Sequence, residues 1–456
     1  MEDFFASRFY QFLSLISTII IPIVGFLVSY FQIRDARTEK KIRNFKITSE
    51  ITPEDRGEYV EHCLALYKEK FQSQIRQRRV VVRNLLYKRS WMQSPDSQLF
   101  HDLNDIEVEI TDQHWEKHPP RAAFLPYPRE GFAANRKYGL SGNSSKLFNG
   151  KLFALESLSG DLNAGNLRVS VKNGAYFDFL DSCEYLAYEM AYVRRVKRIR
   201  PPYPLRLIPA FSLLPNRSRV GDVFDLDNRF AGIGINTATI LYNVEMPGAA
   251  LDAPEKTERR AILLLHHRSS QVAEGIGAIH VIPAGSYQPI GQKLDSPFNR
   301  NMANTVYREF GEELLNIDEL AHLNAEELLD EKLRRWKVLL LGFGIEPLNT
   351  KIEVLTTLQI DLALEENRRI FGNCRSLSQL ENFFSTNYEG HLSLVPLERR
   401  NLLQYQRDPR MTPAGKELLS ILLEHEDYFL KPPAAPNKKA EPMPVQHQPC
   451  WNSWEK

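Results

Sequence analysis

The segment from Ile276 to Ile317 constrains the fold most, because two different periodicities meet in it. Its first part, Ile276 to Ile282, is short, apolar and rich in β-branched residues, which is typical of a buried strand. The strand is expected to end at Pro283-Ala284-Gly285, since proline and glycine mark turns. A helical pattern follows, in which apolar residues recur every four positions: Met302, Val306, Phe310 and Leu314. The segment therefore predicts a strand, a tight turn and an amphipathic helix packed on a sheet.

The same helix carries a group of acidic residues. Glu309, Glu312 and Glu313 have the spacing i, i+3 and i+4, which places three carboxylates on one side of a helix. Carboxylates this close repel one another unless they face water or a cation neutralises them, and a set of oxygen ligands suits Mg²⁺ or Mn²⁺. Such a metal would polarise phosphate oxygens. The pattern predicts either a metal site for phosphate chemistry or a solvated acidic face.

Together, the turn and the acidic helix resemble the Nudix box, Gx5Ex7REUxEExGU, in which U is a bulky apolar residue. Gly285 corresponds to the first glycine, the stretch Arg308 to Glu313 matches REUxEE, and Leu263 to Arg268 is similar to the strand that enters such domains. Gly291 stands where the box has a glutamate, and sixteen residues separate it from Arg308 where seven are usual. Leu315-Asn316 replaces the closing glycine and apolar residue.

The resemblance implies a fold and a set of site residues. It implies an α/β/α sandwich with a mixed sheet, and a divalent metal, Mg²⁺ or Mn²⁺, held by Glu309, Glu312 and Glu313. In an active domain the same three glutamates would be catalytic, with Arg308 orienting one of them. The residues expected to contact a nucleotide are Arg268, Gly285 and Arg308. Because the box lacks one carboxylate, we expect metal binding without fast hydrolysis.

The overall composition is that of an ordinary globular protein. The chain has 456 residues, of which 25% are charged and 43% hydrophobic, so it is long enough for two or three domains. A net charge of +1 gives no reason to expect binding to double-stranded nucleic acid. The four cysteines are scattered and form no CxxC pair, which argues against a zinc site and a disulfide framework.

Residues 9–33 form an uncharged run of 25 residues, which is long enough to cross the hydrocarbon core of a bilayer as a helix. Pro22 and Gly25 within it are better tolerated in a membrane helix than in a soluble one. A signal peptide is one alternative, although residues 1–8 lack its basic region, and a buried helix is the other. The cations between 34 and 46 predict that the rest of the chain is cytoplasmic. The run therefore predicts a single-pass membrane helix that places residues 1–8 outside the cytoplasm.

Three further regions complete the chain. Residues 34–150 are expected to form a basic juxtamembrane and mixed helical and irregular region, helical from 52 to about 91 and irregular over 95–150. Residues 155–431 alternate strand and helix patterns around the acidic helix and are expected to form the Nudix-like domain. The proline-rich residues 432–456 are expected to be disordered. The predicted fold class is α+β, with a transmembrane helix, a helical linker region and a sandwich domain.

Two basic groups lie outside the acidic helix. The first interleaves cations with apolar residues: Arg76, Arg78, Arg79, Arg83, Lys88 and Arg89. It predicts either a face that binds anions or a membrane, or the solvated side of a helix or strand. The second, at 194–200, follows a helix expected over 179–196 and either contacts phosphates or stabilises the helix C-terminus.

A membrane span followed by a partly degenerate Nudix-like domain resembles the membrane-anchored effectors of bacterial cyclic-oligonucleotide antiphage systems (CBASS). The resemblance implies that the domain senses a cyclic oligonucleotide, that the chain forms a homo-oligomer, and that the spans disrupt the lipid bilayer of the bacterial inner membrane. A messenger that favours one assembly must bind it more tightly than the other. The alternatives are an anchored Nudix hydrolase that cleaves a nucleoside diphosphate derivative, and a scaffold without chemistry.

Overall fold

The structure is a computed structural model of the chain. It describes residues 52–97, 99–114, 149–196, 214–246, 258–268, 277–291, 293–315, 336–372, 374–384 and 390–431. Within these ranges, no helix combines the length and the apolar character needed to cross a membrane. The longest of the described helices, α3 (Pro53–Lys70), has 18 residues and carries charged side chains in both its first and its last turn. Charged groups of this density are not accepted by lipid hydrocarbon.

This finding corrects two predictions, the membrane helix in the fold class and the single-pass location in the inner membrane. The described helices and strands form a mixed α+β fold with mixed sheets. The run at 9–33, on which both predictions rested, lies outside the described residues, as do residues 1–8 and the tail at 432–456.

Most strands belong to one sheet of ten strands. Its path is β1-β2-β11-β12-β7-β8-β13, while β3 pairs with β11, β9 with β8 and β10 with β7. The central partners β7 and β12 run parallel, and the other pairs are antiparallel. The bounds are β1 (Val80–Val82), β2 (Leu86–Lys88), β3 (His101–Asp102), β7 (Ile233–Met246), β8 (Glu258–Arg268), β9 (Ile279–Val281), β10 (Ala284–Ser286), β11 (Lys337–Ile345), β12 (Ile352–Asp361) and β13 (Gly390–Pro396).

The two central strands are buried on both faces, which explains their nearly continuous runs of apolar and β-branched residues. The longer of the two is β7, with 14 residues, of which the first ten are all buried. Two of the polar side chains that enter this core bond to each other, since the hydroxyls of Thr237 and Thr356 are 2.8 Å apart. A paired hydroxyl avoids the penalty of burying an unsatisfied polar group.

A second sheet of three strands has the order β4-β6-β5. Its strands are β4 (Val108–His114), β5 (Lys151–Ser159) and β6 (Arg168–Ala175). The backbone of β5 joins it to the larger sheet, because the amide of Phe153 donates to the carbonyl of Tyr287 and that of Leu155 to the carbonyl of Ala231. The expectation of irregular structure over 95–150 is wrong for β3 and β4, whose short alternating pattern is hidden among turn-forming residues.

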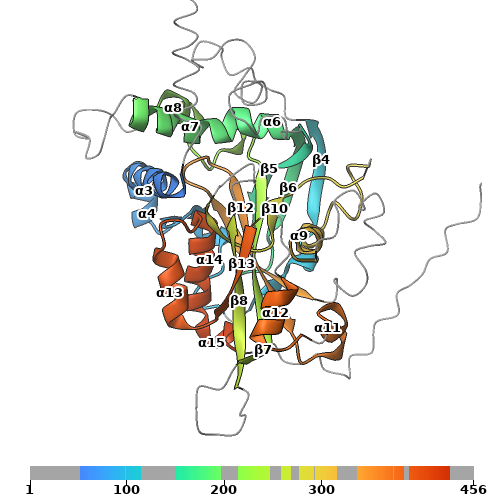
Figure 1. The fold of residues 1–456 in the computed structure, drawn as a ribbon. Coiled ribbons are helices and arrows are strands. Elements are labelled where there is room, and N and C mark those ends of the chain that lie inside the picture. Colours follow the sequence, from blue (N-terminus) through green and yellow to red (C-terminus); the bar gives the residue numbers. More distant parts are fainter. Residues whose placement is uncertain are drawn as a thin grey trace, which may run out of the picture.

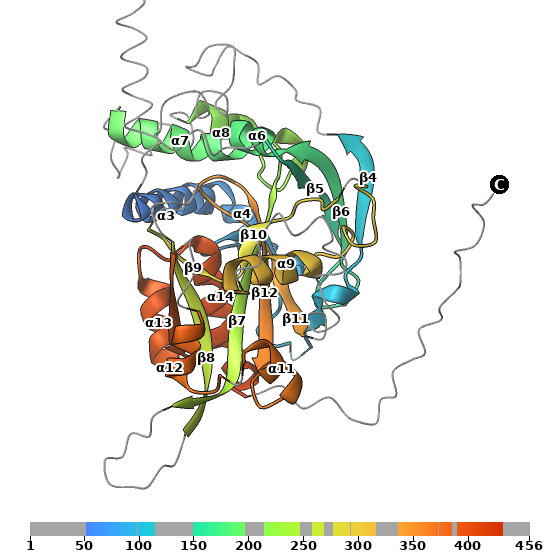
Figure 2. The same ribbon diagram turned by 45° about the vertical axis from the view of Figure 1, so that its right-hand side comes forward.

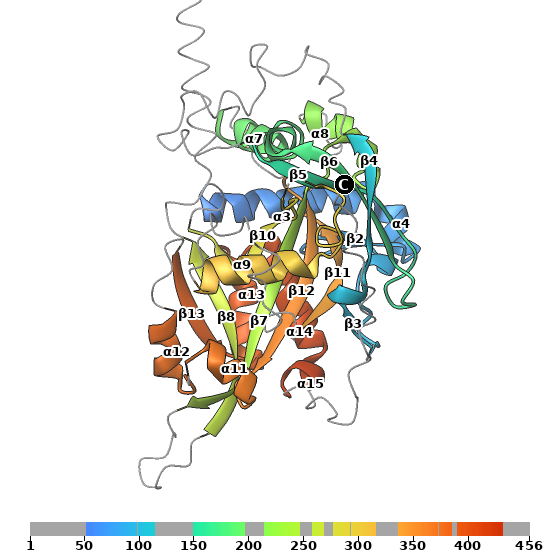
Figure 3. The ribbon, with the colours of Figure 1, turned by 90° about the vertical axis from the view of Figure 1, so that its right-hand side faces the viewer.

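Helices cover both faces of the larger sheet. Figures 1 and 3 show α9 (Ala303–Leu315) on one face, with α3, α13 and α14 on the other. Figure 2 shows α6, α7 and α8 across one end, above α3. The remaining helices are α4 (Gln72–Arg76), α6 (Tyr176–Phe179), α7 (Tyr185–Ala191), α8 (Pro215–Val220), α11 (Glu365–Ile370), α12 (Leu377–Phe383), α13 (Arg399–Arg407), α14 (Pro413–Glu424) and α15 (Glu426–Phe429). Single turns are η2 (Arg89–Trp91), η3 (Leu103–Asp105), η8 (Leu226–Asn228) and the π-helical η6 (Leu180–Glu184) and η7 (Tyr192–Val196).

The start of α3 follows directly from the sequence. Thr52 accepts a hydrogen bond from the amide of Asp55 at 3.2 Å, and Pro53 occupies the first turn, as the pattern predicts. The basic group after 194 packs against this helix, because Arg194 pairs with Glu58 and Arg195 with Asp55. Residues 197–200 lie outside the described part of the chain. The described arginines of this group therefore join two helices.

Two fully buried arginines hold the turn between β11 and β12. Arg217 donates from Nη1 to the carbonyl of Pro347 at 2.7 Å and to the hydroxyl of Tyr67 at 2.9 Å. Arg229 donates from Nε to the carbonyl of Thr350 at 3.1 Å. Buried guanidinium groups need such acceptors, since an unpaired buried charge is strongly unfavourable. These contacts fix the turn against α3 and α8.

Candidate functional site

The site predicted from the sequence lies where α9 crosses β10. Gly285 is the central residue of β10 and faces Ile235 of β7 in the antiparallel register. A Cβ atom at Gly285 would lie 2.0 Å from both Cδ and Oε1 of Glu309. The missing side chain therefore lets the Glu309 carboxylate approach the strand backbone. Because contacts this short cannot coexist with a side chain, any residue other than glycine here would push the Glu309 carboxylate away from β10.

The apolar stripe of α9 forms the contact with the sheet. Met302, Val306, Phe310 and Leu314 are all buried, as their four-residue spacing predicts. Phe310 meets Trp336 edge to face, with ring centroids 4.9 Å apart. Burying this stripe fixes the rotation of α9 and so turns its charged residues toward β10.

Arg308 connects two of the glutamates. Its side chain is 4% exposed, and its Nη2 group donates to Oε1 of Glu309. Nη1 lies 3.5 Å from Oε1 of Glu312, and Nη2 lies 3.4 Å from the carbonyl of Ser286. The buried Nε atom has no hydrogen-bond partner within the described part of the chain. One short contact and two long ones leave the guanidinium with donor capacity that an anion could use.

The third glutamate binds the turn directly. Oε2 of Glu313 accepts a hydrogen bond from the amide of Ala284 at 3.0 Å. Glu309 and Glu312 keep 13% and 18% of their side chains exposed. The structure thus brings Gly285, Arg308, Glu309, Glu312 and Glu313 together, and we call these five residues the α9 site.

The α9 site does not form a metal cage in this arrangement. Among the described residues, no group of three His, Cys, Asp or Glu side chains is placed to hold a metal ion. The reason is local, because the guanidinium of Arg308 contacts both Glu309 and Glu312 while Glu313 is bound to a backbone amide. A hard divalent cation needs several oxygen atoms converging on one point. The three glutamates therefore do not fit Mg²⁺ or Mn²⁺ as they stand here.

Arg268, expected to contact a nucleotide, lies at the end of β8, and within the described part of the chain no hydrogen bond or ion pair links it to the α9 site. Its backbone pairs with Ala278 and Gly277. Its neighbours are two histidines that face each other across the strands, His266 on β8 and His280 on β9. Burial, followed by the charge of Arg268, lowers the pKa of His266 to about 4 and that of His280 to about 3. The positive charge of Arg268 therefore helps to keep both histidines of its own hairpin neutral.

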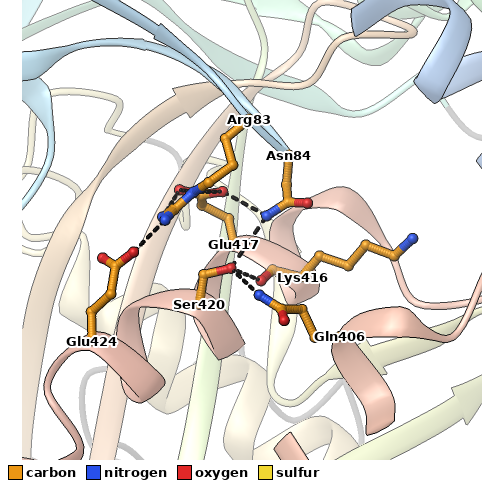
Figure 4. Close-up of polar contacts among 7 residues, drawn as sticks. All are labelled: Arg83, Asn84, Gln406, Lys416, Glu417, Ser420 and Glu424. Atoms are coloured by element: carbon orange, nitrogen blue, oxygen red, sulfur yellow. Dashed lines mark hydrogen bonds and ion pairs between the residues drawn. The ribbon is translucent and has the colours of Figure 1, made fainter. Parts of the chain in front are cut away.

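A second cluster of charged residues was missed by sequence reasoning (Figure 4). Arg83 of the basic run reaches Glu417 of α14, with Nε 2.9 Å from Oε1 and 3.1 Å from Oε2. Asn84 donates to the other side of the same carboxylate at 2.9 Å. Arg83 also pairs with Glu424. The partners are more than 300 positions apart in the chain, so no local pattern could join them.

This cluster, which we call the Arg83–Glu417 network, is completed by Ser420 and Gln406. Gln406 donates to the hydroxyl of Ser420 at 2.6 Å, and that hydroxyl donates to the carbonyl of Lys416. The Glu417 side chain is 0% exposed. Burial and the neighbouring Glu417 carboxylate raise the pKa of the Tyr87 hydroxyl.

A cleft lies beside the network, away from α9. Figure 4 shows the Lys416 side chain extending away from Glu417. The cleft is lined by Pro53, Arg56, Gly57, Val60, Glu61, Leu64, Asn84, Ala278, Pro409, Arg410, Met411, Thr412, Pro413 and Lys416. None of these residues belongs to α9 or β10, so this cleft and the α9 site are separate features.

Comparisons with known proteins identify a weak structural neighbour and no family. No family model and no curated protein matches the chain. Among solved structures, a mutT/nudix family protein from Listeria innocua is a weak neighbour, with 12% sequence identity and a TM-score of 0.25. The match covers 44% of this chain and 98% of that one. A likeness this weak does not assign the chain to a family.

Proposed function

We propose that this chain binds a nucleotide at the α9 site and responds to it without fast turnover. The observation that carries the proposal is the position of Arg308, which is buried beside Gly285 and bonded to Glu309 and Glu312. Its long contact to Glu312 and its unused Nε are the donors that a phosphate oxygen would take. The box-like residues around it support a nucleotide as the source of that phosphate.

The finer proposal concerns the ligand and the setting. A cyclic oligonucleotide of a CBASS-type antiphage system is the first candidate, because the partly degenerate box resembles the sensing domains of such systems. We further propose a homo-oligomer whose assembly the ligand shifts, which requires unequal affinity for the two assemblies. The proposal covers sensing alone and includes no action on a membrane.

One experiment separates sensing from hydrolysis. The full chain is titrated with cyclic dinucleotides and trinucleotides by calorimetry, and product formation is followed by chromatography with and without Mg²⁺. Sensing predicts binding without product in either buffer. Arg308→Lys keeps the charge but loses the forked donor, and we expect affinity to fall by about tenfold or more, since a charged hydrogen bond contributes roughly 1.5–3 kcal/mol.

The competing function is Nudix-type hydrolysis of a nucleoside diphosphate derivative. The close approach of Glu309 to Gly285 favours it, since that contact brings together the glycine and the acidic helix of the box-like segment. It predicts release of product that needs Mg²⁺ and is lost in Glu312→Gln. Such turnover would replace the sensing proposal, and failure of every nucleotide to bind would remove both. Thermal melting of each variant confirms that the fold is intact.

A further inference from the structure

The basic run at residues 76–89 is divided by the fold. Arg83 turns inward to Glu417 and Glu424. The other cations gather in one region, which we call the basic patch: Arg76, Arg78, Arg79, Lys88 and Arg89. The four arginines are exposed and Lys88 is half-buried. Within the described part of the chain, none of the five forms an ion pair.

An arginine occupies a backbone position in this patch that favours glycine. The amide of Arg78 donates to the carbonyl of Ile75, and the amide of Arg79 donates to the carbonyl of Gln74, both at 2.9 Å. This pair of bonds ends α4 with a residue in the left-handed region, and Arg78 has a φ of 56°. A Cβ atom is strained there, so Arg78 adopts this conformation against the local preference for glycine.

The neighbouring hairpin adds a second unfavourable feature. Val80 of β1 pairs with Lys88 of β2, and the amide of Arg89 donates to the carbonyl of Arg79 at 3.1 Å. This register sets Arg79 beside Arg89 at the end of the hairpin. Like charges opposite each other on paired strands are destabilising. Strain and repulsion in this small region both cost stability, and a bound anion would offset the repulsion.

The chemistry of the patch favours phosphate groups. Four of its five cations are arginines, whose planar forks bond two oxygens of one phosphate. Lys88 is held over Trp91, with Nζ 5.0 Å from the ring centroid. Trp91 and Tyr87 are themselves buried, so neither ring offers a surface on which a base could stack. Contacts would therefore be made to a phosphate backbone rather than to bases.

The position of the patch narrows the choice between a flexible and a rigid phosphate-bearing ligand. α4 lies at the margin of the fold (Figure 3), and β1, the partner of β2, is the edge strand at that end of the larger sheet. Next to Lys88 and Phe224, Asp222 and Asp225 accept bonds from their own loop backbone, so carboxylates border the patch on that side. A flexible chain can follow such an edge past this border. A rigid duplex would contact fewer of the five cations at once.

We propose that the basic patch binds single-stranded nucleic acid through its phosphates, independently of base sequence. This surface is distinct from the α9 site, and its ligand is a polymer rather than a small nucleotide. Each phosphate contact contributes about −0.7 to the slope of log K against log salt concentration, so five contacts give a slope of about −3.5. A slope of this size is expected if all five cations contact phosphates, and the variants below locate these contacts.

The test measures the full chain with fluorescent oligothymidylate by anisotropy over a range of salt concentrations. Arg78→Gly removes one cation and relieves the strained backbone. We expect it to bind about fivefold more weakly near 0.1 M salt and to flatten the slope by about 0.7, while its melting temperature rises. Arg78→Lys keeps the charge and should therefore keep the salt slope of the parent protein, while the loss of the forked donor weakens binding less than Arg78→Gly does.

Controls make the outcome decisive. Arg399→Ala removes an exposed arginine of α13 and should leave binding unchanged. Substituting Arg76 and Arg89 together with alanine should flatten the slope by about 1.4 without loss of folding. The proposal is overturned if oligothymidylate does not bind at low salt, or if the Arg78→Gly slope equals that of the parent. Equal binding of polyglutamate, a duplex or anionic vesicles would overturn the single-stranded assignment.

Discussion

The α9 site and the Arg83–Glu417 network both place glutamates beside an arginine, yet they satisfy the charges differently. In the network, the carboxylate of Glu417 is fully buried and receives Arg83 from one side and Asn84 from the other. In the α9 site, Arg308 bonds closely to Glu309 and distantly to Glu312, and both carboxylates stay partly exposed. The first arrangement is complete, and the second keeps hydrogen-bonding capacity for another molecule.

The difference separates a stabilising cluster from a candidate binding site. A buried carboxylate bonded to Arg83 and Asn84 fixes α14 against the β1–β2 hairpin. Because it is 0% exposed, a ligand cannot reach its oxygen atoms. A partly open group of charges contributes less to folding but can recognise phosphate. Mutations in the two regions should therefore affect different measurements, folding in one case and binding in the other.

The largest expected effect is that of Glu417→Ala. It leaves Arg83 near Glu424 but removes the only carboxylate that Asn84 contacts within the described part of the chain. Breaking a buried pair by deleting one partner is expected to reduce the free energy of unfolding by about 3–5 kcal/mol. Urea denaturation followed by circular dichroism measures it, with nucleotide affinity of the folded fraction unchanged. A loss below about 1 kcal/mol would show that the network contributes no more to stability than an exposed ion pair.

A smaller effect on folding, with a large one on binding, is expected for Gly285→Ala. The new methyl group would lie 2.0 Å from the Glu309 carboxylate, so that side chain must move away from β10. Forcing an extra carbon into a packed site costs about 1–3 kcal/mol of stability. Calorimetry should show that nucleotide binding is lost, because Arg308 is bonded to Glu309 and would move with it.

Gly372→Ala is the matched control for this change. Gly372, unlike Gly285, lies in the left-handed region, with a φ of 60°, and an added Cβ meets nothing within 4 Å. It should cost some stability through backbone strain and leave nucleotide affinity as it was. Equal affinity in the two alanine variants would contradict the role given to the Gly285–Glu309 contact.

The comparison also shows which parts of the fold a sequence can predict. Gly285 and the apolar stripe of α9 were found because their pattern is local: a glycine after a strand, then residues four apart on one helix. The partnership of Arg83 with Glu417 was not found, because it joins a hairpin to a helix at the far end of the chain. Arg83 therefore seemed to belong to the exposed basic run.

The predicted metal ligands are not gathered into a cage among the described residues, for a different reason. Helical spacing places Glu309, Glu312 and Glu313 on one side but does not say where each carboxylate points. In the structure Arg308 and the amide of Ala284 take up these oxygens. Strands β3 and β4 were missed because two to seven residues beside proline-rich and glycine-rich sequence carry too little periodicity.

The smallest effect sets the baseline for both regions. Arg399 and Glu426 form a third arginine–glutamate pair, with Nη1 2.9 Å from Oε2, but the two side chains are 62% and 29% exposed. Solvent and salt screen such a pair, so Arg399→Ala should change the free energy of unfolding by about 0–1 kcal/mol. Urea denaturation at low and high salt measures it, and the small loss should shrink further as salt is added. If Arg399→Ala destabilised the chain as much as Glu417→Ala, burial would not be what distinguishes these pairs.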